Sequence, residues 1–308
     1  MDDYLSTRIK EEVRKIALQS GFCLCGFTIP VIQSSDFLRY EKWLDQQNFG
    51  EMTWMTREDH IAKRQTPLLI LPSARSIMVL GTFIHLFPPD QDIQTASFAH
   101  YQDYHVQISN FCKNFLFEIQ NKLDLTFESR ICIDSSPILE RSLAVQAGLG
   151  WIGKSGMLIN PIWGSAIILS ECLISLPFQP DQPFEKDFCG ECRACIAACP
   201  SACIQPQSRT INAGKCISYL TIEKHGKFSK EEEDVIGKHV FGCDICTEVC
   251  PWNNKNSEKS SPLLLSDFIP SLSDIDISNE IFKEKFRESP IFRLKNERLQ
   301  RNIKSIIS

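Results

Sequence analysis

No stretch of this 308-residue sequence approaches the roughly 18 consecutive apolar residues that a membrane-spanning helix requires. The first residues, MDDYLSTRIKEEVRK, are acidic and amphipathic and lack the apolar segment of a secretory signal peptide. Without an export signal, the 14 cysteines are not expected to form the disulfide framework of a secreted protein. We therefore expect a protein of the reducing cytoplasm that does not associate with membranes.

The chain also lacks a net positive charge. The chain has 33 Lys and Arg against 38 Asp and Glu, so its net charge of -5 gives no overall attraction to nucleic acid, and any such binding needs a local basic patch. Apolar residues make up 43% of the chain, which is ample for a packed core. The length predicts a globular protein of two or three domains.

Cysteine is the abundant exception, and seven of the 14 cysteines are gathered in two runs. The first is Cys189-Gly-Glu-Cys192-Arg-Ala-Cys195-Ile-Ala-Ala-Cys199-Pro200, and the second is Cys243-Asp-Ile-Cys246-Thr-Glu-Val-Cys250-Pro251. The first run has the spacing of bacterial ferredoxins, in which three thiolates bind one iron–sulfur cube and the fourth, before proline, reaches a second cube. Two cubes need eight thiolates, and the two runs supply seven.

The lone Cys216 between the runs is the natural eighth ligand. We assign one cluster to Cys189, Cys192, Cys195 and Cys250, and the other to Cys199, Cys216, Cys243 and Cys246. Cys203 is the alternative to Cys216 because it lies closer to the first run, although a buried inert thiol is the simpler expectation there. Paired C-x2-C motifs also bind zinc, but a triplet plus a Cys-Pro repeated in mirror order favours clusters over a four-ligand zinc site.

Hydrophobic periodicity predicts helices over residues 4–19, 36–48 and 104–123 and buried strands over 76–83 and 165–174. Pro177, Pro180 and Pro183 mark a linker into the cysteine-rich part. The glycines Gly148, Gly150 and Gly153 match G-x-G-x-x-G but follow a predicted helix, so a dinucleotide site is not expected. They instead allow a tight turn or close approach to a large flat ligand.

Asp134 lies at a predicted strand-to-helix corner. Ser136 is expected to cap the following helix, with Pro137 at its first position and Gly148 at its end. A carboxyl group among apolar neighbours has a raised pKa and can act as a general acid. A capping aspartate is instead stabilised by the helix dipole, which lowers its pKa. The local pattern leaves both roles open and favours the cap.

Several stretches together resemble the epoxyqueuosine reductase family. They are Gly50-Glu-Met-Thr-Trp-Met55, Asp103-Tyr-His105, Asp134-Ser-Ser-Pro-Ile-Leu-Glu-Arg141, Ala147-Gly-Leu-Gly-Trp-Ile-Gly-Lys154 and the two cysteine runs. The resemblance implies a cytoplasmic, monomeric oxidoreductase that reduces epoxyqueuosine to queuosine, the last step of queuosine biosynthesis. Its substrate would be position 34 of tRNAs with a GUN anticodon, the acceptors of Tyr, His, Asp and Asn.

The resemblance also implies an α+β architecture related to reductive dehalogenases. A cobalamin-binding catalytic α/β domain would span residues 1–180, a ferredoxin-like domain with two [4Fe-4S] clusters 181–256, and a C-terminal helical segment 257–308. Cob(I)alamin would break the carbon–oxygen bond, the clusters would relay electrons from an external donor, and Asp134 would donate the proton. By similarity, the residues expected at the corrin are Arg57, Asp134, Lys154, Ser155, Leu158, Leu169, Gly242, Cys243 and Asp244.

The sequence departs from the family pattern at three positions: Phe98 stands for a tyrosine, and Tyr101 and Ser170 each stand for a glycine. A tRNA substrate predicts local positive charge, and residues 280–304 carry eight Lys or Arg against four Glu. The expected RNA contacts are Lys215, Lys224, Lys227, Arg293, Lys295, Arg298 and Arg301. An ordinary solvated helix face is the alternative for these charges.

Two other functions share some of these features. A reductive dehalogenase would use the same cofactors but is expected to carry an export signal. A plain two-cluster electron carrier would leave the residues before the cysteine runs without a task. Binding of added cobalamin separates the carrier from the reductase.

Overall fold

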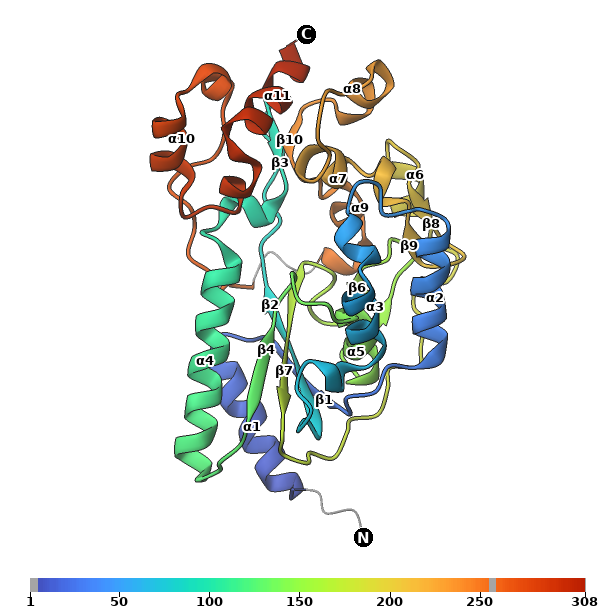
Figure 1. The fold of residues 1–308 in the computed structure, drawn as a ribbon, viewed down its shortest axis with the longest axis vertical. Coiled ribbons are helices and arrows are strands. Elements are labelled where there is room, and N and C mark those ends of the chain that lie inside the picture. The colour runs from blue at the N-terminus through green and yellow to red at the C-terminus, as the bar shows by residue number, and fades with distance from the viewer. Residues whose placement is uncertain (1–4, 255–258, 308) are drawn as a thin grey trace.

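A four-stranded antiparallel sheet lies at the centre of the computed structural model, which describes residues 5–254 and 259–307 (Figure 1). The strand order is β1 (Leu24–Thr28), β2 (Ser76–Phe83), β7 (Ile167–Ile174) and β4 (Ser129–Cys132). β2 pairs with β7 along its whole length, from Ser76 opposite Ile174 to Phe83 opposite Ile167. Every residue of β2 is buried, because helices cover both faces of the sheet.

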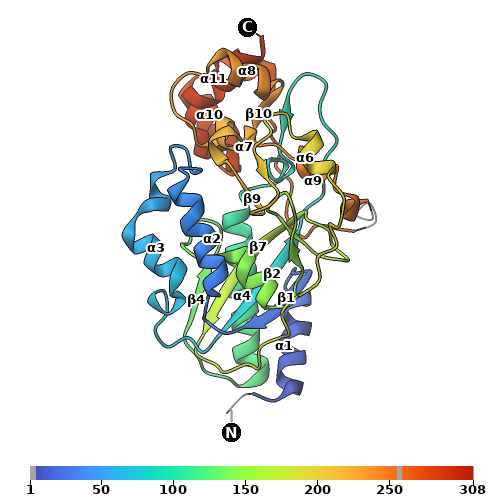
Figure 2. The ribbon, with the colours of Figure 1, turned by 90° about the vertical axis from the view of Figure 1, so that its right-hand side faces the viewer.

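The two faces of the sheet carry separate hydrophobic cores. Helices α1 (Thr7–Gln19) and α4 (Tyr104–Leu123) cover one face, where Met78 and Leu80 of β2 point. Helices α2 (Ser34–Asp45) and α5 (Glu140–Gln146) cover the other, with α3 (Glu58–Gln65) beside them (Figure 2). Because side chains alternate along a strand, Ile77 and Val79 enter this second core. The mixed α+β class expected from the sequence is confirmed.

The longest predicted elements occur close to their expected limits, although position 4 lies outside the described residues. The predicted start of α5 is wrong. This helix begins at Glu140, its N-cap Leu139 has no capping side chain, and residues 133–138 form a turn. Asp134 in that turn has φ +44, and its N–H is bound by the Glu140 side chain. Neither Asp134 nor Ser136 caps the helix, because the helix begins after Leu139 and no side chain accepts a hydrogen bond at its N-cap.

The glycine run after α5 serves close packing of the backbone. It leads into a hairpin of β5 (Trp151–Ile152) and β6 (Leu158–Ile159). Gly148 has φ +74, and a Cβ atom at Gly150 would lie 2.1 Å from the carbonyl oxygen of Ile159. The tight-turn interpretation of these glycines is therefore the one that the structure supports.

The cysteine runs lie next to each other because α6 (Ala194–Ala198) packs against α9 (Ile245–Glu248) (Figure 2). Short elements connect them: β8 (Ile204–Gln205), β9 (Thr210–Ile211), α7 (Ile217–Ile222), α8 (Lys230–Ile236) and β10 (His239–Phe241). Single turns of 3-10 helix occur at Thr53–Thr56, Pro67–Leu69, Ser97–His100, Ala213–Lys215, Pro251–Asn253, Leu272–Asp276 and Pro290–Leu294.

The C-terminal helices α10 (Asn279–Phe286) and α11 (Lys295–Ile307) share their core with earlier parts of the chain. Their Phe286 and Leu299 pack with Ile93 and Phe241, and β3 (Gln94–Thr95) pairs in parallel with β10. The three-domain division stays a prediction, and its boundary at 256/257 lies outside the described residues. Across the described ranges, no helix is both long and apolar enough to span a membrane.

Candidate active site

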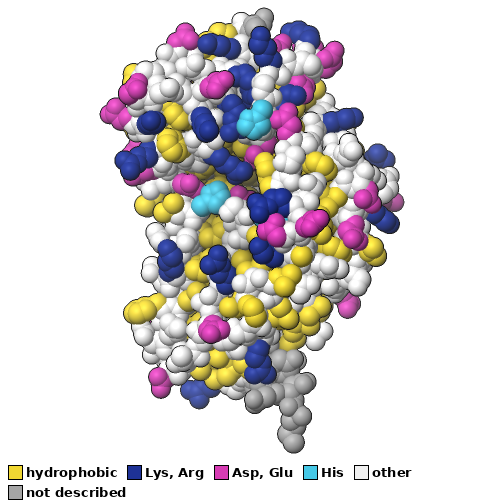
Figure 3. Space-filling view, in the orientation of Figure 1, with side chains coloured by type: hydrophobic (Ala, Val, Ile, Leu, Met, Phe, Trp, Pro, Cys, Tyr) yellow, Lys and Arg dark blue, Asp and Glu magenta, His cyan; other side chains and the backbone are white. Residues whose placement is uncertain are grey.

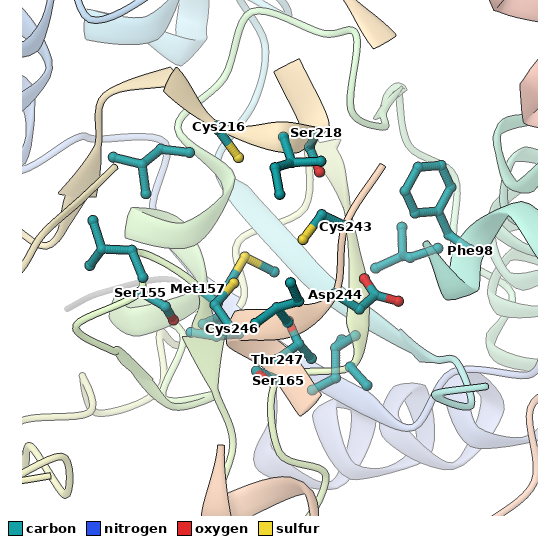
Figure 4. Close-up of a pocket in the computed structure, with 18 of the residues that line it drawn as sticks. Phe98, Ser155, Met157, Ser165, Cys216, Ser218, Cys243, Asp244, Cys246 and Thr247 are labelled. Atoms are coloured by element: carbon teal, nitrogen blue, oxygen red, sulfur yellow. The ribbon is translucent and has the colours of Figure 1, made fainter. Parts of the chain in front are cut away.

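A cavity of about 440 Å³ lies between the start of β7 and the two cysteine runs. Its lining is mainly apolar and includes Ile167, Ile168 and Leu169 of β7. In Figure 4, Cys216, Cys243 and Cys246 project toward it from one side, while Phe98 and Asp244 lie near each other at another. Segments far apart in the sequence therefore form a single site, which is a suitable shape for a large, mostly apolar ligand.

Six of the nine residues expected at the corrin line this cavity: Asp134, Ser155, Leu158, Leu169, Cys243 and Asp244. Three do not. Arg57 is exposed on the surface, where its Nε lies 3.0 Å from Asp59. Lys154 donates to the backbone carbonyls of Gly190 and Cys192 and so supports the first cysteine loop.

Gly242 is the third residue outside the cavity wall. Its N–H donates to Thr221 Oγ1 at 2.9 Å, and its φ of +71 is a conformation that glycine adopts without strain. A Cβ atom there would lie 2.6 Å from that of Ala96. Gly242 therefore helps to fix the position of the neighbouring Cys243, and its contact with the corrin stays a prediction.

The three departures from the family pattern lie in different surroundings. Phe98 lines the cavity, so its missing hydroxyl group changes the wall itself. Tyr101 is buried elsewhere and accepts a hydrogen bond from the backbone N–H of His85. Ser170 faces α4, where its hydroxyl oxygen lies 3.7 Å from the Cys112 sulfur. Only the first departure reaches the cavity.

Sequence reasoning missed several cavity residues, including Met157, Ser218 and Thr247, which Figure 4 labels. No local pattern marks them as ligand contacts. They reach the cavity because β6, α7 and α9 meet there, which is decided by the tertiary fold.

The predicted cluster ligands fall into two spatial groups. The outer thiol set comprises Cys189, Cys192, Cys195 and Cys250, which surround a small cavity of about 40 Å³. The inner thiol set comprises Cys199, Cys216, Cys243 and Cys246, which line the large cavity. Cys250 interacts electrostatically with the other outer thiols, and Cys246 with Cys216 and Cys199. The structure thus brings together the groups that the sequence assigned, while their role as ligands stays a prediction.

The thiols of both sets are available as ligands, because all 14 cysteines are free. Within the described ranges, no three His, Cys, Asp or Glu side chains converge closely enough to hold a single metal ion. Each set supplies four thiols, which is the number that one cube of four irons binds.

Asp134 lies at the rim of the large cavity and is held by side chains from two distant segments. Its Oδ2 accepts hydrogen bonds from Tyr104 Oη at 3.1 Å and His105 Nε2 at 3.0 Å, and Arg293 Nη1 lies 3.9 Å away. Partial burial alone would raise the pKa of Asp134, but these neighbours outweigh it and lower the pKa. Of the two directions that the local sequence pattern left open, the structure supports a lowered pKa, although Asp134 does not cap the helix, and the carboxyl group is ionised at neutral pH.

His105 lies between two carboxylates. Its Nδ1 is 2.8 Å from Asp103, and its Nε2 contacts Asp134. Burial would lower the pKa of His105, but hydrogen bonds and attraction from Asp103 and Asp134 raise it to about 9. The imidazolium form has a donor for each carboxylate. The proton of this group at neutral pH is thus carried by His105.

Two further carboxyl groups belong to this cluster: Glu140 contacts the backbone of Asp134, and Glu171 interacts with Glu140. Glu140 Oε1 accepts the N–H of Asp134 at 2.9 Å, and burial followed by repulsion from Asp134 raises the pKa of Glu140. Glu171 is fully buried, and neither of its carboxyl oxygens has a hydrogen-bond partner in the described part of the chain. Burial and Glu140 raise the pKa of Glu171 well above its usual value. Both carboxyl groups are therefore harder to ionise than an ordinary glutamate.

The predicted RNA contacts differ in how they are used. Lys215, Lys227 and Lys295 are exposed, whereas Lys224 pairs with Glu232 at 2.9 Å. Arg293 is 49% exposed and lies between Glu223 and Asp134. Figure 3 shows that Lys and Arg side chains, mixed with acidic ones, gather on the upper part of this face, where the C-terminal helices lie.

Arg298 and Arg301 instead bind the end of α7. Arg301 donates to the carbonyls of Leu220, Lys224 and Gly226 and to the side chain of Asn302. Arg298 donates to the carbonyl of Ile222 at 2.6 Å and to two carbonyls of its own segment. All five N–H donors of Arg301 are occupied, so its first role is to join α11 to α7.

The profile of the 4Fe-4S double cluster binding domain matches residues 188–253, which makes this segment a 4Fe-4S cluster-binding domain. An epoxyqueuosine reductase of Leadbetterella byssophila is 34% identical over 299 residues, covering 95% of this chain and 96% of that protein. The epoxyqueuosine reductase of Escherichia coli is 35% identical over 257 residues, covering 80% of this chain and 65% of that protein.

The chain is also similar to solved structures of epoxyqueuosine reductases. A selenomethionine-labelled epoxyqueuosine reductase matches with a TM-score of 0.85 at 29% identity, over 97% of this chain and 81% of that one. An epoxyqueuosine reductase with an epoxyqueuosine-modified tRNA-Tyr stem loop matches with a TM-score of 0.83 at 27% identity, over the same shares. Identity above 30% across almost the whole length of both proteins establishes common descent. The chain belongs to the epoxyqueuosine reductase family of oxidoreductases.

Proposed function

We propose that this chain reduces epoxyqueuosine to queuosine at position 34 of tRNAs with a GUN anticodon. The main support is the family relationship over 95% of the chain, combined with a cavity that has thiols on one side and a carboxylate at its rim. The related structure with an epoxyqueuosine-modified tRNA-Tyr stem loop supports a tRNA substrate. Such a substrate would be met in the cytoplasm.

The residues present fit two kinds of redox cofactor. The outer and inner thiol sets would each hold one [4Fe-4S] cluster, and cobalamin would lie in the large cavity against Leu158, Leu169 and Asp244. When bound, cobalamin supplies a nucleophilic cobalt that cleaves carbon–oxygen bonds. Cys192 of the outer set is exposed, while the inner set lines the cavity, so the two sets mark a path inward for electrons from an external donor.

Asp134 and His105 would together supply the proton that the opened epoxide takes up. When the epoxide opens, its oxygen develops negative charge and takes up one proton. Because the pKa of Asp134 is lowered, that proton starts on the His105 imidazolium, whose Nε2 lies 3.0 Å from Asp134 Oδ2, and would pass through the Asp134 carboxyl group to the oxygen, leaving His105 neutral. Asp103 keeps the imidazole ring in position through its contact with Nδ1 at 2.8 Å.

The tRNA would bind across the face that carries Lys215, Lys227, Arg293 and Lys295. Phosphate contacts from exposed lysines fix the register of a nucleic acid, and an extruded base is read in a pocket. Arg293 is near enough to Asp134, at 3.9 Å, to link the RNA-facing surface to the catalytic carboxylate.

Anaerobic reconstitution tests this proposal. The protein is loaded with iron, sulfide and cobalamin, incubated with a chemical reductant and epoxyqueuosine-containing tRNA, and the nucleosides are analysed by mass spectrometry. We expect about eight irons and one corrinoid per chain, and conversion of epoxyqueuosine to queuosine. A protein that holds eight irons but refuses every corrinoid is an electron carrier, and the proposal then fails.

A further inference from the structure

Cys203 is a buried thiol beside the inner thiol set, and the function proposed above gives it no role. Its side chain is 4% exposed, and its sulfur lies 3.6 Å from that of Cys199. It also interacts with the thiol of Cys216. The thiol therefore lies beside two of the sulfurs predicted to hold the cluster nearest the cavity.

The backbone around Cys203 fixes the position of this sulfur. The preceding turn is closed by a hydrogen bond from the N–H of Ala202 to the carbonyl of Cys199 at 3.1 Å. On the other side, the N–H of Asn212 donates to the carbonyl of Cys203 at 2.8 Å, which ties it to the β8–β9 hairpin. Because both sides are anchored, the contact with Cys199 and Cys216 is a property of the fold.

Cys203 lies at the edge of the inner set, and Cys216 lies within it. Cys216 interacts electrostatically with Cys199, Cys243 and Cys246. The partners of Cys203 are Cys199, Cys216 and the hydroxyl of Ser201. A cube of four irons takes four thiolates, so a fifth thiol at the edge of the set keeps its proton.

We propose that Cys203 donates its S–H hydrogen bond to the ligand sulfur of Cys199, next to Cys216, and thereby raises the reduction potential of the cluster facing the cavity. This inference rests on the proposed function, because it requires a cluster held by the inner set. The hydroxyl of Ser201, 3.6 Å from the Cys199 sulfur, is a second donor to the same ligand.

Hydrogen bonds to ligand sulfurs act on the reduced cluster more than on the oxidised one. One electron, supplied by the external donor, enters the cluster and increases the negative charge on its sulfurs. A donor beside those sulfurs stabilises the added charge. The proton stays on Cys203 in both states, so the step moves one electron and breaks no bond. Cys203 would thus set how readily the cluster nearest the cavity is reduced.

The test compares Cys203→Ala and Cys203→Ser with the native protein, each reconstituted anaerobically. Iron is counted, and both cluster potentials are measured by redox titration followed by electron paramagnetic resonance. We expect about eight irons in all three proteins. In Cys203→Ala, one cluster should titrate at a lower potential, its reduced-to-oxidised ratio falling roughly threefold to tenfold at the native midpoint, as one lost hydrogen bond predicts. Serine, which keeps a donor, should restore most of that ratio.

Cys112→Ala is the matched control, because Cys112 is also fully buried but lies on α4 against Ser170. It should leave both potentials unchanged. Unaltered potentials in Cys203→Ala, or a loss of about four irons in that variant, would overturn the inference. A native protein that lacks the inner cluster contradicts the proposed function instead, so the two failures are distinguishable.

Discussion

Asp134 acquires its chemical character from residues distant in the sequence. In the sequence it follows Ile133 and precedes two serines, but Tyr104, His105 and Arg293 surround its carboxyl group and lower its pKa. Asp134 and His105 therefore form an ion pair that shares one proton. Proton donation by Asp134 would depend on His105.

Replacing Asp134 with Asn tests the role of the carboxyl group. The amide cannot donate an acidic proton, so we expect both kinds of cofactor to bind as before while kcat falls by at least about 100-fold. Single-turnover conversion of epoxyqueuosine-containing tRNA measures the effect. Asp124→Asn is the control, because Asp124 is exposed, has φ +51, and asparagine tolerates that conformation. Full turnover in the Asp134 variant would remove its role as the acid.

The raised pKa of His105 predicts how stability changes with pH. The folded-state pKa is about 9 and the ordinary value is 6.5, so the folded state binds the proton more tightly. The stabilisation is complete below pH 6.5 and is lost as the pH rises through 9. Urea unfolding at these two pH values should show a loss in the native protein and a smaller loss in His105→Gln. Equal losses in both proteins would contradict the assignment.

At the scale of elements, α11 is a structural brace before it is a binding surface. The excess of Lys and Arg over residues 280–304 predicted RNA contacts, but Arg298 and Arg301 turn inward to the carbonyls at the end of α7. These carbonyls lack helical partners, so a guanidinium group that donates to several of them stabilises the junction. The exposed lysines are the better candidates for phosphate contacts.

Arg301→Ala and Lys295→Ala should separate these two roles. Loss of Arg301 leaves carbonyl groups unpaired and should lower the free energy of unfolding by roughly 1–3 kcal/mol. Lys295→Ala should leave stability within about 0.5 kcal/mol and reduce the salt dependence of tRNA binding by about one phosphate contact. Denaturant unfolding and binding measured at several salt concentrations give both quantities. If the dependence of tRNA affinity on salt concentration is unchanged in Lys295→Ala, Lys295 is an ordinary solvated side chain and does not contact a phosphate.

At the scale of the whole molecule, the cavity exists because separate parts of the chain share a core. The C-terminal helices pack with Ile93 of the early chain and Phe241 of the middle part. The same part of the chain brings Arg293 next to Asp134. The inner thiol set and Asp134 both line one cavity.

The two thiol sets predict that the clusters can be removed one at a time. Cys216→Ala should lose the inner cluster and Cys250→Ala the outer one, each leaving about four irons per chain. Iron analysis and electron paramagnetic resonance after anaerobic reconstitution measure this. If Cys216→Ala keeps all its iron, the eighth ligand is a different residue, and Cys203 is the first to examine.

The sequence by itself determined the features that depend on local spacing. Hydrophobic periodicity predicted the strand over Ser76–Phe83 and the helix over Tyr104–Leu123. The spacing of the cysteines predicted cluster ligands, because a short loop can bring three thiols to one iron–sulfur cube. Tertiary structure decided which side chains face one another. The proton of the Asp134–His105 pair, the inward turn of Arg301 and the contact of Cys203 with Cys199 all depend on long-range packing. Electrostatic and hydrogen-bond partners are set by distance in space, which no local pattern encodes.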